Sequence, residues 1–142
     1  MNLKTTFAQN FFRIFLGLIM IYIGIAHLTF RRIEFQAQVP VWITQNENII
    51  DFIVIVSGYI EIIFGLTLIF LNKYKIYIGI ALAVFFILIF PGNINQYIYE
   101  IDALRLDSNE KRFYRLLFQP VLVLWALWSS GGLKYLIQRN NK

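Results

Sequence analysis

The sequence contains no cysteine, which excludes disulfides, thiolate metal sites and dithiol redox chemistry carried by this chain. It is also poor in charge, since charged residues make up 15% of its 142 residues, against about 25% in soluble domains. Hydrophobic residues reach 58%. A soluble chain this short cannot bury so much apolar surface, because small domains have a large surface for their volume. The scarcity of charge therefore favours a membrane protein, whose outer face is solvated by lipid.

Four long apolar stretches follow one another along the chain, and each is long enough to cross a bilayer. A spanning helix needs about 20 apolar residues, with a range of about 17–25. Inside lipid a single chain satisfies its backbone by forming helices, and barrel strands would show an alternating pattern that these stretches lack. We therefore predict an all-α fold, a polytopic membrane four-helix bundle that forms a single transmembrane domain over residues 1–142. The expected spans are 12–30, 52–71, 76–98 and 115–134, with an interfacial or re-entrant segment at 33–46.

The first apolar stretch also has features of a signal peptide, which would be removed from the mature protein. Lys4 supplies a positive N-terminal region, and residues 24–26 (Gly-Ile-Ala) resemble a small-residue cleavage site. The stretch is longer than the apolar part of a usual signal peptide. A retained span is therefore the favoured interpretation.

The charges between the stretches indicate an orientation. An even number of spans places both termini on one side, with seven Lys and Arg residues there and six on the other side. All acidic residues outside the spans lie on the second side. We therefore expect a multi-pass protein of the bacterial inner (cell) membrane with both termini in the cytoplasm. The net charge of +5 has no contiguous basic cluster, which favours membrane lipids over nucleic acid as partners.

Polar side chains lie in the outer half of every predicted span, and Glu61 lies deepest. It is about 14 Å into the second span at the helical rise of 1.5 Å per residue. An ionisable group near the bilayer centre costs about 2.5–3.5 kcal/mol, so such residues usually face the bundle and mark a site. Gly58 and Gly65 share its helix face, and small residues permit close helix contact. Glu61 is therefore expected to point inward, either into a functional site or as a neutral structural residue bonded to a neighbouring helix.

His27 is the single histidine and lies near the outer end of the first span, one turn beyond Gly24 on a stripe that begins at Gly17. It is the nearest candidate partner for Glu61, and a His–Glu pair can exchange protons near neutral pH. A lone histidine near an interface is also often an ordinary hydrogen-bonding residue. One His and one Glu without Cys make no convincing ligand set, so no metal is expected. Arg13, at the inner edge of this span, is expected to snorkel to the headgroups.

Pro91 and Gly92 interrupt the third predicted span. Proline removes a backbone hydrogen bond and predicts a kink, and glycine loosens the helix further. Unwound backbone at that depth is tolerated only where it faces protein or a wet cavity. Asn93 and Asn95 follow directly, and Gln119 lies at the same level of the fourth span.

These polar residues together predict a ligand pocket in the outer half of the bundle. A few polar groups set in apolar walls are the usual form of a ligand site. We expect a cavity lined by Glu61 and at least two of three other residues, His27, Asn93 and Gln119, with residues 36–43 as its lid. Trp42 in this lid would close the mouth at headgroup level. The candidate ligand-binding residues are His27, Trp42, Glu61, Asn93, Asn95 and Gln119.

Several short motifs occur in a fixed order along the first three predicted spans. They are Arg13-x-x-x-Gly17 leading to Gly24-Ile25-Ala26-His27-Leu28, Val39-Pro40-Val41-Trp42, Ser57-Gly58-x-x-Glu61-x-x-x-Gly65, and Phe90-Pro91-Gly92-Asn93-Ile94. In their order and spacing the chain resembles the DoxX-like family of small bacterial membrane proteins, over roughly residues 10–97. This resemblance implies a four-helix membrane fold. Some relatives of that family are subunits associated with sulfur-compound oxidation and quinone reduction, others accompany membrane redox systems, and most have no assigned activity.

The sequence thus favours an integral membrane protein whose outer-half pocket binds a small amphipathic or quinone-like molecule, as a component of a membrane redox system. No intrinsic cofactor is expected, and a quinone is the candidate for a bound cofactor. The sequence contains no cofactor motif that would make the chain an enzyme by itself. The expected partners are membrane lipids and either a subunit of a redox system or a second copy of the chain. Two alternatives stay open: a small transporter or lipid-handling protein, and a structural assembly subunit without a ligand.

Overall fold

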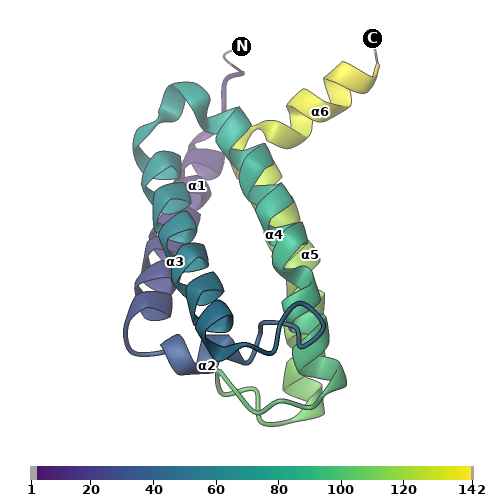
Figure 1. Cartoon of the computed structure of the whole chain (residues 1–142). Helices are drawn as coiled ribbons and strands as arrows, with labels where there is room; N and C mark the ends of the chain where they lie inside the picture. Colours follow the sequence, from purple (N-terminus) through teal and green to yellow (C-terminus); the bar gives the residue numbers. More distant parts are fainter. Residues whose placement is uncertain (1–2, 142) are drawn as a thin grey trace.

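Long helices make up most of this protein, as seen in a computed structural model that describes residues 3–141. The elements are α1 (Phe7–Leu28), α2 (Arg32–Gln36), α3 (Glu47–Phe70), the 3-10 helix η1 (Asn72–Tyr74), α4 (Lys75–Ile98), α5 (Asn109–Ser130) and α6 (Gly132–Asn140) (Figure 1). Over residues 3–141 there is no strand, only an isolated bridge between Ala103 and Leu106. The prediction of an all-α fold is confirmed for this part of the chain.

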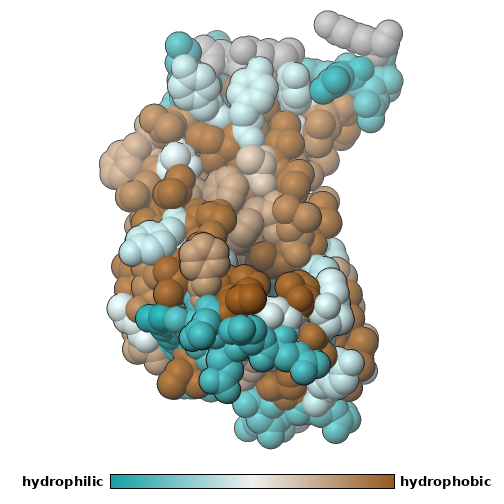
Figure 2. All heavy atoms as spheres, viewed as in Figure 1, coloured by the Kyte–Doolittle hydropathy of each residue, from teal (hydrophilic) through white to brown (hydrophobic). Residues whose placement is uncertain are grey.

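The long helices have the length and composition that a bilayer requires. α1, α3, and the η1–α4 segment are each long and apolar enough to cross a membrane, and α5 with α6 qualifies as a fourth span if this bent pair is counted as one. In Figure 2 one face of the molecule shows an apolar band between two hydrophilic ends. Large apolar side chains such as Phe52, Phe70 and Leu88 are exposed on the outer faces. These features are compatible with a multi-pass membrane protein.

Two helices begin before the predicted spans, because capping residues and not hydropathy set their first turns. α1 starts at Phe7 behind a capping box, in which the Thr6 side chain accepts from the Gln9 amide and the Gln9 side chain accepts from the Thr6 amide. α3 starts at Glu47 instead of residue 52, because the Asn46 side chain accepts two backbone N–H groups of its first turn. Hydropathy marks only the apolar part of such a helix.

The predicted fourth span, 115–134, begins inside α5 and runs past the end of that helix. α5 begins at Asn109, where the side chain of Ser108 caps the helix by accepting from the Lys111 amide. It ends at Gly131, whose φ of +83° lies in the left-handed region that favours glycine. α6 then continues at 85° to α5. The turn was hidden in the hydropathy pattern, because Leu133 follows it and prolongs the apolar stretch.

The predicted unwinding at Pro91 and Gly92 is also wrong, since α4 is helical from Lys75 to Ile98. Pro91 lacks the N–H that would bond four residues back in the helix. At this level Gln119 of α5 donates from Nε2 to the backbone carbonyl of Phe86 at 2.6 Å. The carbonyl that lacks its helical donor because of Pro91 is that of Ile87, so the bond from Gln119 reaches the carbonyl one residue before it.

The four long helices form two tightly packed pairs, α1 against α3 and α4 against α5, while the pairs contact each other less closely (Figure 1). Glycines make the α1–α3 contact. A Cβ added at Gly24 would lie 2.6 Å from the carbonyl oxygen of Gly58, and one at Gly17 would lie 2.9 Å from that of Gly65. All four glycines are buried, as the rule that small residues permit close contact between membrane helices predicts.

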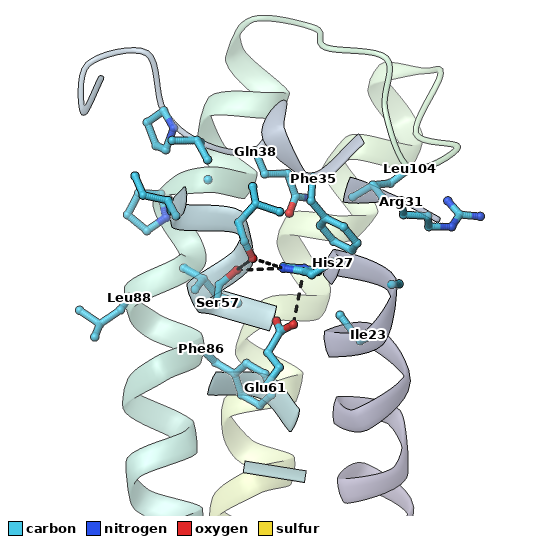
Figure 3. Close-up of a pocket in the computed structure, with 18 of the residues that line it drawn as sticks. Ile23, His27, Arg31, Phe35, Gln38, Ser57, Glu61, Phe86, Leu88 and Leu104 are labelled. Atoms are coloured by element: carbon cyan, nitrogen blue, oxygen red, sulfur yellow. Dashed lines mark hydrogen bonds and ion pairs between the residues drawn. The ribbon is translucent and has the colours of Figure 1, made fainter. Parts of the chain in front are cut away.

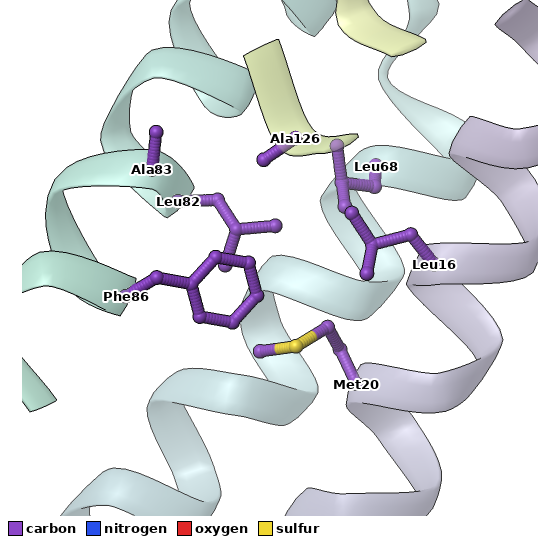
Figure 4. Packing of buried hydrophobic residues seen from close by; sticks show 7 residues of the cluster. All are labelled: Leu16, Met20, Leu68, Leu82, Ala83, Phe86 and Ala126. Carbon is purple, nitrogen blue, oxygen red and sulfur yellow. The ribbon is translucent and has the colours of Figure 1, made fainter. Parts of the chain in front are cut away.

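A hydrophobic cluster joins the two pairs in the half of the bundle that carries the chain termini. Its buried members are Leu16 and Met20 of α1, Leu68 of α3, Leu82, Ala83 and Phe86 of α4, and Ala126 of α5 (Figure 4). Every one of the long helices contributes to this cluster. It therefore holds the four helices together between the level of the predicted pocket and the end that carries the chain termini.

Arg13 lies inside the protein next to this cluster. It is 4% exposed and donates from Nη1 to the backbone carbonyl of Leu68 in the last turn of α3. The expectation that Arg13 snorkels to the headgroups is therefore wrong. Instead its guanidinium satisfies a carbonyl at a helix C-terminus, where a positive charge is favourable.

Candidate functional site

A cavity of about 470 Å³ lies between the two helix pairs, at the end of the bundle that carries α2. All four long helices contribute to its walls, and Met20 and Phe86 of the hydrophobic cluster form part of its floor. The predicted lid, residues 36–43, covers one side, since residues 38–43 except Val41 line the cavity. The sequence therefore placed the cavity and its lid at the correct end of the bundle.

His27 and Glu61 meet at the polar part of this cavity (Figure 3). His27 Nε2 lies 3.5 Å from Glu61 Oε2, and the two residues are only 7% and 5% exposed. On the other side of the imidazole, Nδ1 lies 2.9 Å from Ser57 Oγ, which itself donates to the Val54 carbonyl at 2.9 Å. The ring of Phe35 packs against the imidazole.

The neighbours of the imidazole favour a proton on Nδ1. The Val54 carbonyl, 3.4 Å from His27 Nδ1, can only accept, and Ser57 Oγ accepts from Nδ1 when its own hydrogen is directed to Val54. The Nε2 atom then faces Glu61 and can accept a proton from the carboxyl group or hold one against the carboxylate. At 3.5 Å the two buried side chains are within ion-pair distance, while Glu61 Oε2 makes no hydrogen bond to any residue in the range 3–141.

Arg31 and Arg115 are the two arginines that line the cavity, and in the sequence Arg115 stands out only as a flanking charge. It lines the cavity and lies close enough to Glu61 for their charges to interact. Its Nη1 donates to Gln119 Oε1 at 2.9 Å. Arg115 precedes Gln119 by four residues, so the two share one face of α5. That spacing is the signal that could have identified Arg115.

The amide side chains of α4 and α5 form a hydrogen-bonded chain beside the cavity. Asn93 Nδ2 donates to Gln119 Oε1 at 3.1 Å. From the lid, Gln38 Nε2 donates to Asn93 Oδ1 at 3.4 Å and to Gln96 Oε1 at 3.0 Å. Gln96 in turn donates to two backbone carbonyls in the loop 99–108. This amide chain links the lid to α4, α5 and that loop.

The six candidate residues therefore separate into two groups. His27, Trp42 and Glu61 line the cavity, and Trp42 remains 69% exposed at its edge. Asn93, Asn95 and Gln119 do not line it. The expectation that Glu61 would be joined there by at least two of His27, Asn93 and Gln119 is therefore wrong, because the two amides bond to each other.

Asn95 lies away from both the cavity and the amide chain. It is 3% exposed, and neither of its amide atoms has a hydrogen-bond partner among the residues that the structure describes. Its expected role in orienting a ligand of this cavity thus has no geometric basis.

The cavity opens sideways between the helices. Leu88 of α4 and Trp42 of the lid line it, yet they are 70% and 69% exposed. Figure 3 shows Leu88 directed away from the polar pair. Since Leu88 lies within the long apolar helix α4, the opening faces the same surroundings as the outer faces of the bundle.

Ion pairs and hydrogen bonds fix the position of α2 at the end of the bundle that carries the cavity. Arg32 pairs with the carboxylate of Asp51 at the start of α3, which also accepts from Gln36 Nε2 at 2.9 Å. The hydrogen bond to Asp51 raises the pKa of Arg32 above its ordinary value. Glu34 accepts from the Leu104 amide at 2.7 Å. α2 is thus tied both to α3 and to the loop 99–108.

The lid rests directly on Gly92, and we expect Gly92→Ala to loosen it. A Cβ at this position would lie 2.5 Å from the carbonyl oxygen of Gln38. The added methyl group must therefore displace the lid backbone. The chain has no cysteine, so a single Val39→Cys reporter in the buried part of the lid measures the effect by maleimide labelling. The rate should rise several-fold in Gly92→Ala.

The matched control for this experiment is Ala81→Val, which adds methyl groups to an exposed position of the same helix. It should leave labelling of the Val39→Cys reporter unchanged. Equal rates in the Gly92→Ala variant and the parent protein would show that the lid does not depend on this contact.

Comparison with known protein families adds one finding. A family described as Domain of unknown function (DUF8561) matches residues 16–130. The chain belongs to this family. The DUF8561 match runs from α1 to the last residue of α5 and includes every residue that lines the cavity, while α6 lies outside it. No curated protein and no solved structure matches the chain. The resemblance to the DoxX-like family stays a prediction.

Proposed function

We propose that this chain is a polytopic four-helix membrane protein whose cavity binds a small amphipathic, quinone-like molecule taken up from the bilayer. The observation that carries this proposal is the combination of a sideways opening at Leu88 and Trp42 with the buried His27–Glu61 pair inside. A lipophilic molecule can enter through such an opening without passing through water. The polar group of the molecule then forms hydrogen bonds with His27 and Glu61 inside the cavity.

The charge distribution supports the membrane placement. Both ends of the described chain lie at one end of the bundle, and α2 and the loop 99–108 lie at the other (Figure 1). Apart from Glu61, the acidic residues lie in α2, the first turns of α3 and α5, and the loop 99–108. In a bacterial inner membrane the end with the termini would face the cytoplasm, because it carries seven of the thirteen Lys and Arg residues.

The size and lining of the cavity support a ligand of quinone dimensions. Ligand pockets usually have volumes of about 300–1,000 Å³, apolar walls and a few placed polar groups, and this cavity has about 470 Å³. Glu61, His27 and Arg115 provide a proton-exchanging pair and a cation beside it. A ring carbonyl can accept hydrogen bonds from such groups, and a ring hydroxyl can donate to them.

Reduction of a quinone to a quinol consumes two electrons and two protons. In the proposed arrangement the His27–Glu61 pair gives one proton to the ring oxygen that lies nearest, and water supplies the second proton to the other ring oxygen. The electrons would come from a partner redox subunit. A lipid-handling role is the second candidate function, and the sideways opening favours it, because a single lipid chain could use the same path.

Native mass spectrometry in a mild detergent tests the proposal. The probe is a benzoquinone with a ten-carbon tail, compared with a fatty acid of similar length. Retention of the quinone at one copy per chain is the expected result. Retention of the fatty acid alone favours the lipid-handling function, and binding of neither compound favours an assembly subunit whose polar groups only join helices.

We expect Glu61→Gln to fold normally but to bind the quinone probe about tenfold more weakly, because the amide cannot exchange a proton with His27 and charged groups make the stronger hydrogen bonds. Glu61→Leu should also reduce stability, since it leaves His27 Nε2 buried without a partner, at about 1–3 kcal/mol. Quenching of tryptophan fluorescence by the quinone measures the affinity.

Glu110→Gln is the matched control, because this carboxylate is exposed in the first turn of α5. It should leave the affinity for the probe unchanged. If Glu61→Gln binds the quinone as tightly as the parent protein does, the proposed role of the carboxyl group is wrong.

A further inference from the structure

A second hollow lies at the opposite end of the molecule, where α6 turns away from the bundle (Figure 1). It is a groove of about 350 Å³ between the first turn of α1, the end of α5 and α6. We call it the α6 groove. Its lining combines an aromatic ring, two aliphatic side chains, two amides and one cation: Trp128, Leu133, Ile137, Gln9, Gln138 and Lys134.

Specific contacts fix the position of α6 and therefore the shape of the α6 groove. Gly131 makes the turn in the left-handed conformation and donates its N–H to the Trp128 carbonyl. The Gly132 amide donates to Ser130 Oγ at 3.2 Å, and the ring of Tyr135 packs against Tyr77 of α4. α6 is thus braced against both helices of the α4–α5 pair.

A contact from α1 fixes the other wall of the groove. Gln9 Nε2 donates to the carbonyl of Trp128 at 2.8 Å. This bond joins the first turn of α1 to the last turn of α5. The α6 groove therefore has two walls held by hydrogen bonds, so its shape does not depend on a bound partner.

The end of the molecule that carries the α6 groove is positively charged. Within residues 3–141 it holds five basic residues outside the bundle interior and no Asp or Glu: Lys4, Lys73, Lys75, Lys134 and Arg139. Lys134 makes no ion pair with any residue that the structure describes. A ligand for this groove must therefore supply negative charge and an apolar portion together.

We propose that the α6 groove binds one anionic phospholipid, with the phosphate at Lys134 and the upper part of an acyl chain against Leu133 and Ile137. The inference rests on the proposed membrane placement, in which α6 lies along the bilayer surface, but not on the quinone cavity. Amphipathic helices with Lys and Arg on the polar side lie at that level, and basic pockets between helices bind anionic headgroups. Trp128 has the position of an interfacial aromatic residue.

Native mass spectrometry of the full chain tests this assignment by comparing a phosphatidylglycerol with a phosphatidylcholine of equal chain length. We expect the parent protein to retain one phosphatidylglycerol with clear preference. Lys134→Gln should weaken that binding about fivefold, the effect of one lysine near an anionic headgroup. Lys73→Gln removes one charge from the same end but outside the groove, and it should keep the preference.

Two results would overturn the proposal. One is equal retention of the two lipids by the parent protein. The other is an equal loss in Lys134→Gln and Lys73→Gln, which would indicate a diffuse attraction by the whole end. Titration of the quinone probe on the same samples separates this site from the cavity, because Lys134→Gln should leave quinone affinity unchanged.

Discussion

Replacing Gly24 by isoleucine is expected to destabilise the protein by about 3 kcal/mol, the upper part of the range for overpacked interiors. The Cβ of the new residue would lie 2.6 Å from the backbone oxygen of Gly58 and 2.6 Å from Ile62 Cγ1. A backbone oxygen cannot move aside as a flexible side chain can, so α1 and α3 must separate. Their separation would also lengthen the contact between His27 and Glu61, one turn away on the same two helices.

Helix propensity alone would make isoleucine more stabilising than glycine at this position. A loss of stability in Gly24→Ile therefore reports the close contact between α1 and α3. Unfolding in mixed detergent micelles, followed by the loss of helical circular dichroism, measures the change. Ala81→Ile introduces the same side chain at an exposed position of α4 and should cost much less. A Gly24→Ile protein as stable as its parent would mean that the α1–α3 glycine contact is not formed.

Gln119→Leu is expected to cost about 3 kcal/mol or more, because one substitution removes a partner of two buried polar groups and of the half-buried Arg115, at about 1–3 kcal/mol for each buried group. Gln119 Oε1 accepts from Asn93 at 3.1 Å and from Arg115 at 2.9 Å, and its Nε2 donates to the Phe86 carbonyl at 2.6 Å. Leucine fills a similar volume but offers neither a donor nor an acceptor. The loss should exceed that of any single amide at the surface.

Two further variants show whether the hydrogen bonds cause this loss. Gln119→Glu keeps an acceptor for Asn93 and Arg115 but loses the donor to Phe86, so it should fall between the parent protein and Gln119→Leu. Gln45→Leu makes the same replacement in the exposed loop before α3 and should change little. Equal stability of Gln119→Leu and Gln45→Leu would contradict the amide chain.

The features predicted best from the sequence are those that depend on helical spacing. Gly58, Glu61 and Gly65 share one face, so burial of the two glycines against α1 also brought Glu61 inward to His27. Spacing along a helix fixes which residues share a face, and small residues identify the face that packs closely. The His27–Glu61 contact followed from these two rules.

The features predicted worst depend on the direction in which a helix face points. The depth of a residue along a span does not determine that direction. Asn93 and Gln119 lie at the expected level, but they face each other between α4 and α5 instead of the cavity. Arg115 lies four residues before Gln119 and reaches the cavity. A long side chain near a span end can turn inward as readily as outward, and Arg13 does so at the other end of the bundle.

Photolabelling in lipid nanodiscs tests the proposed ligand cavity most directly, using a benzoquinone that carries a ten-carbon tail and a photoreactive azide. We expect labels in residues 22–27, 53–61 and 86–92, which contribute to the cavity walls. Ile53→Trp should reduce labelling several-fold by filling the cavity. Its neighbour Phe52 is exposed and does not line the cavity, so Phe52→Trp should leave labelling unchanged. Labels spread over the outer faces of the helices, with equal yield in both variants, would contradict a ligand cavity.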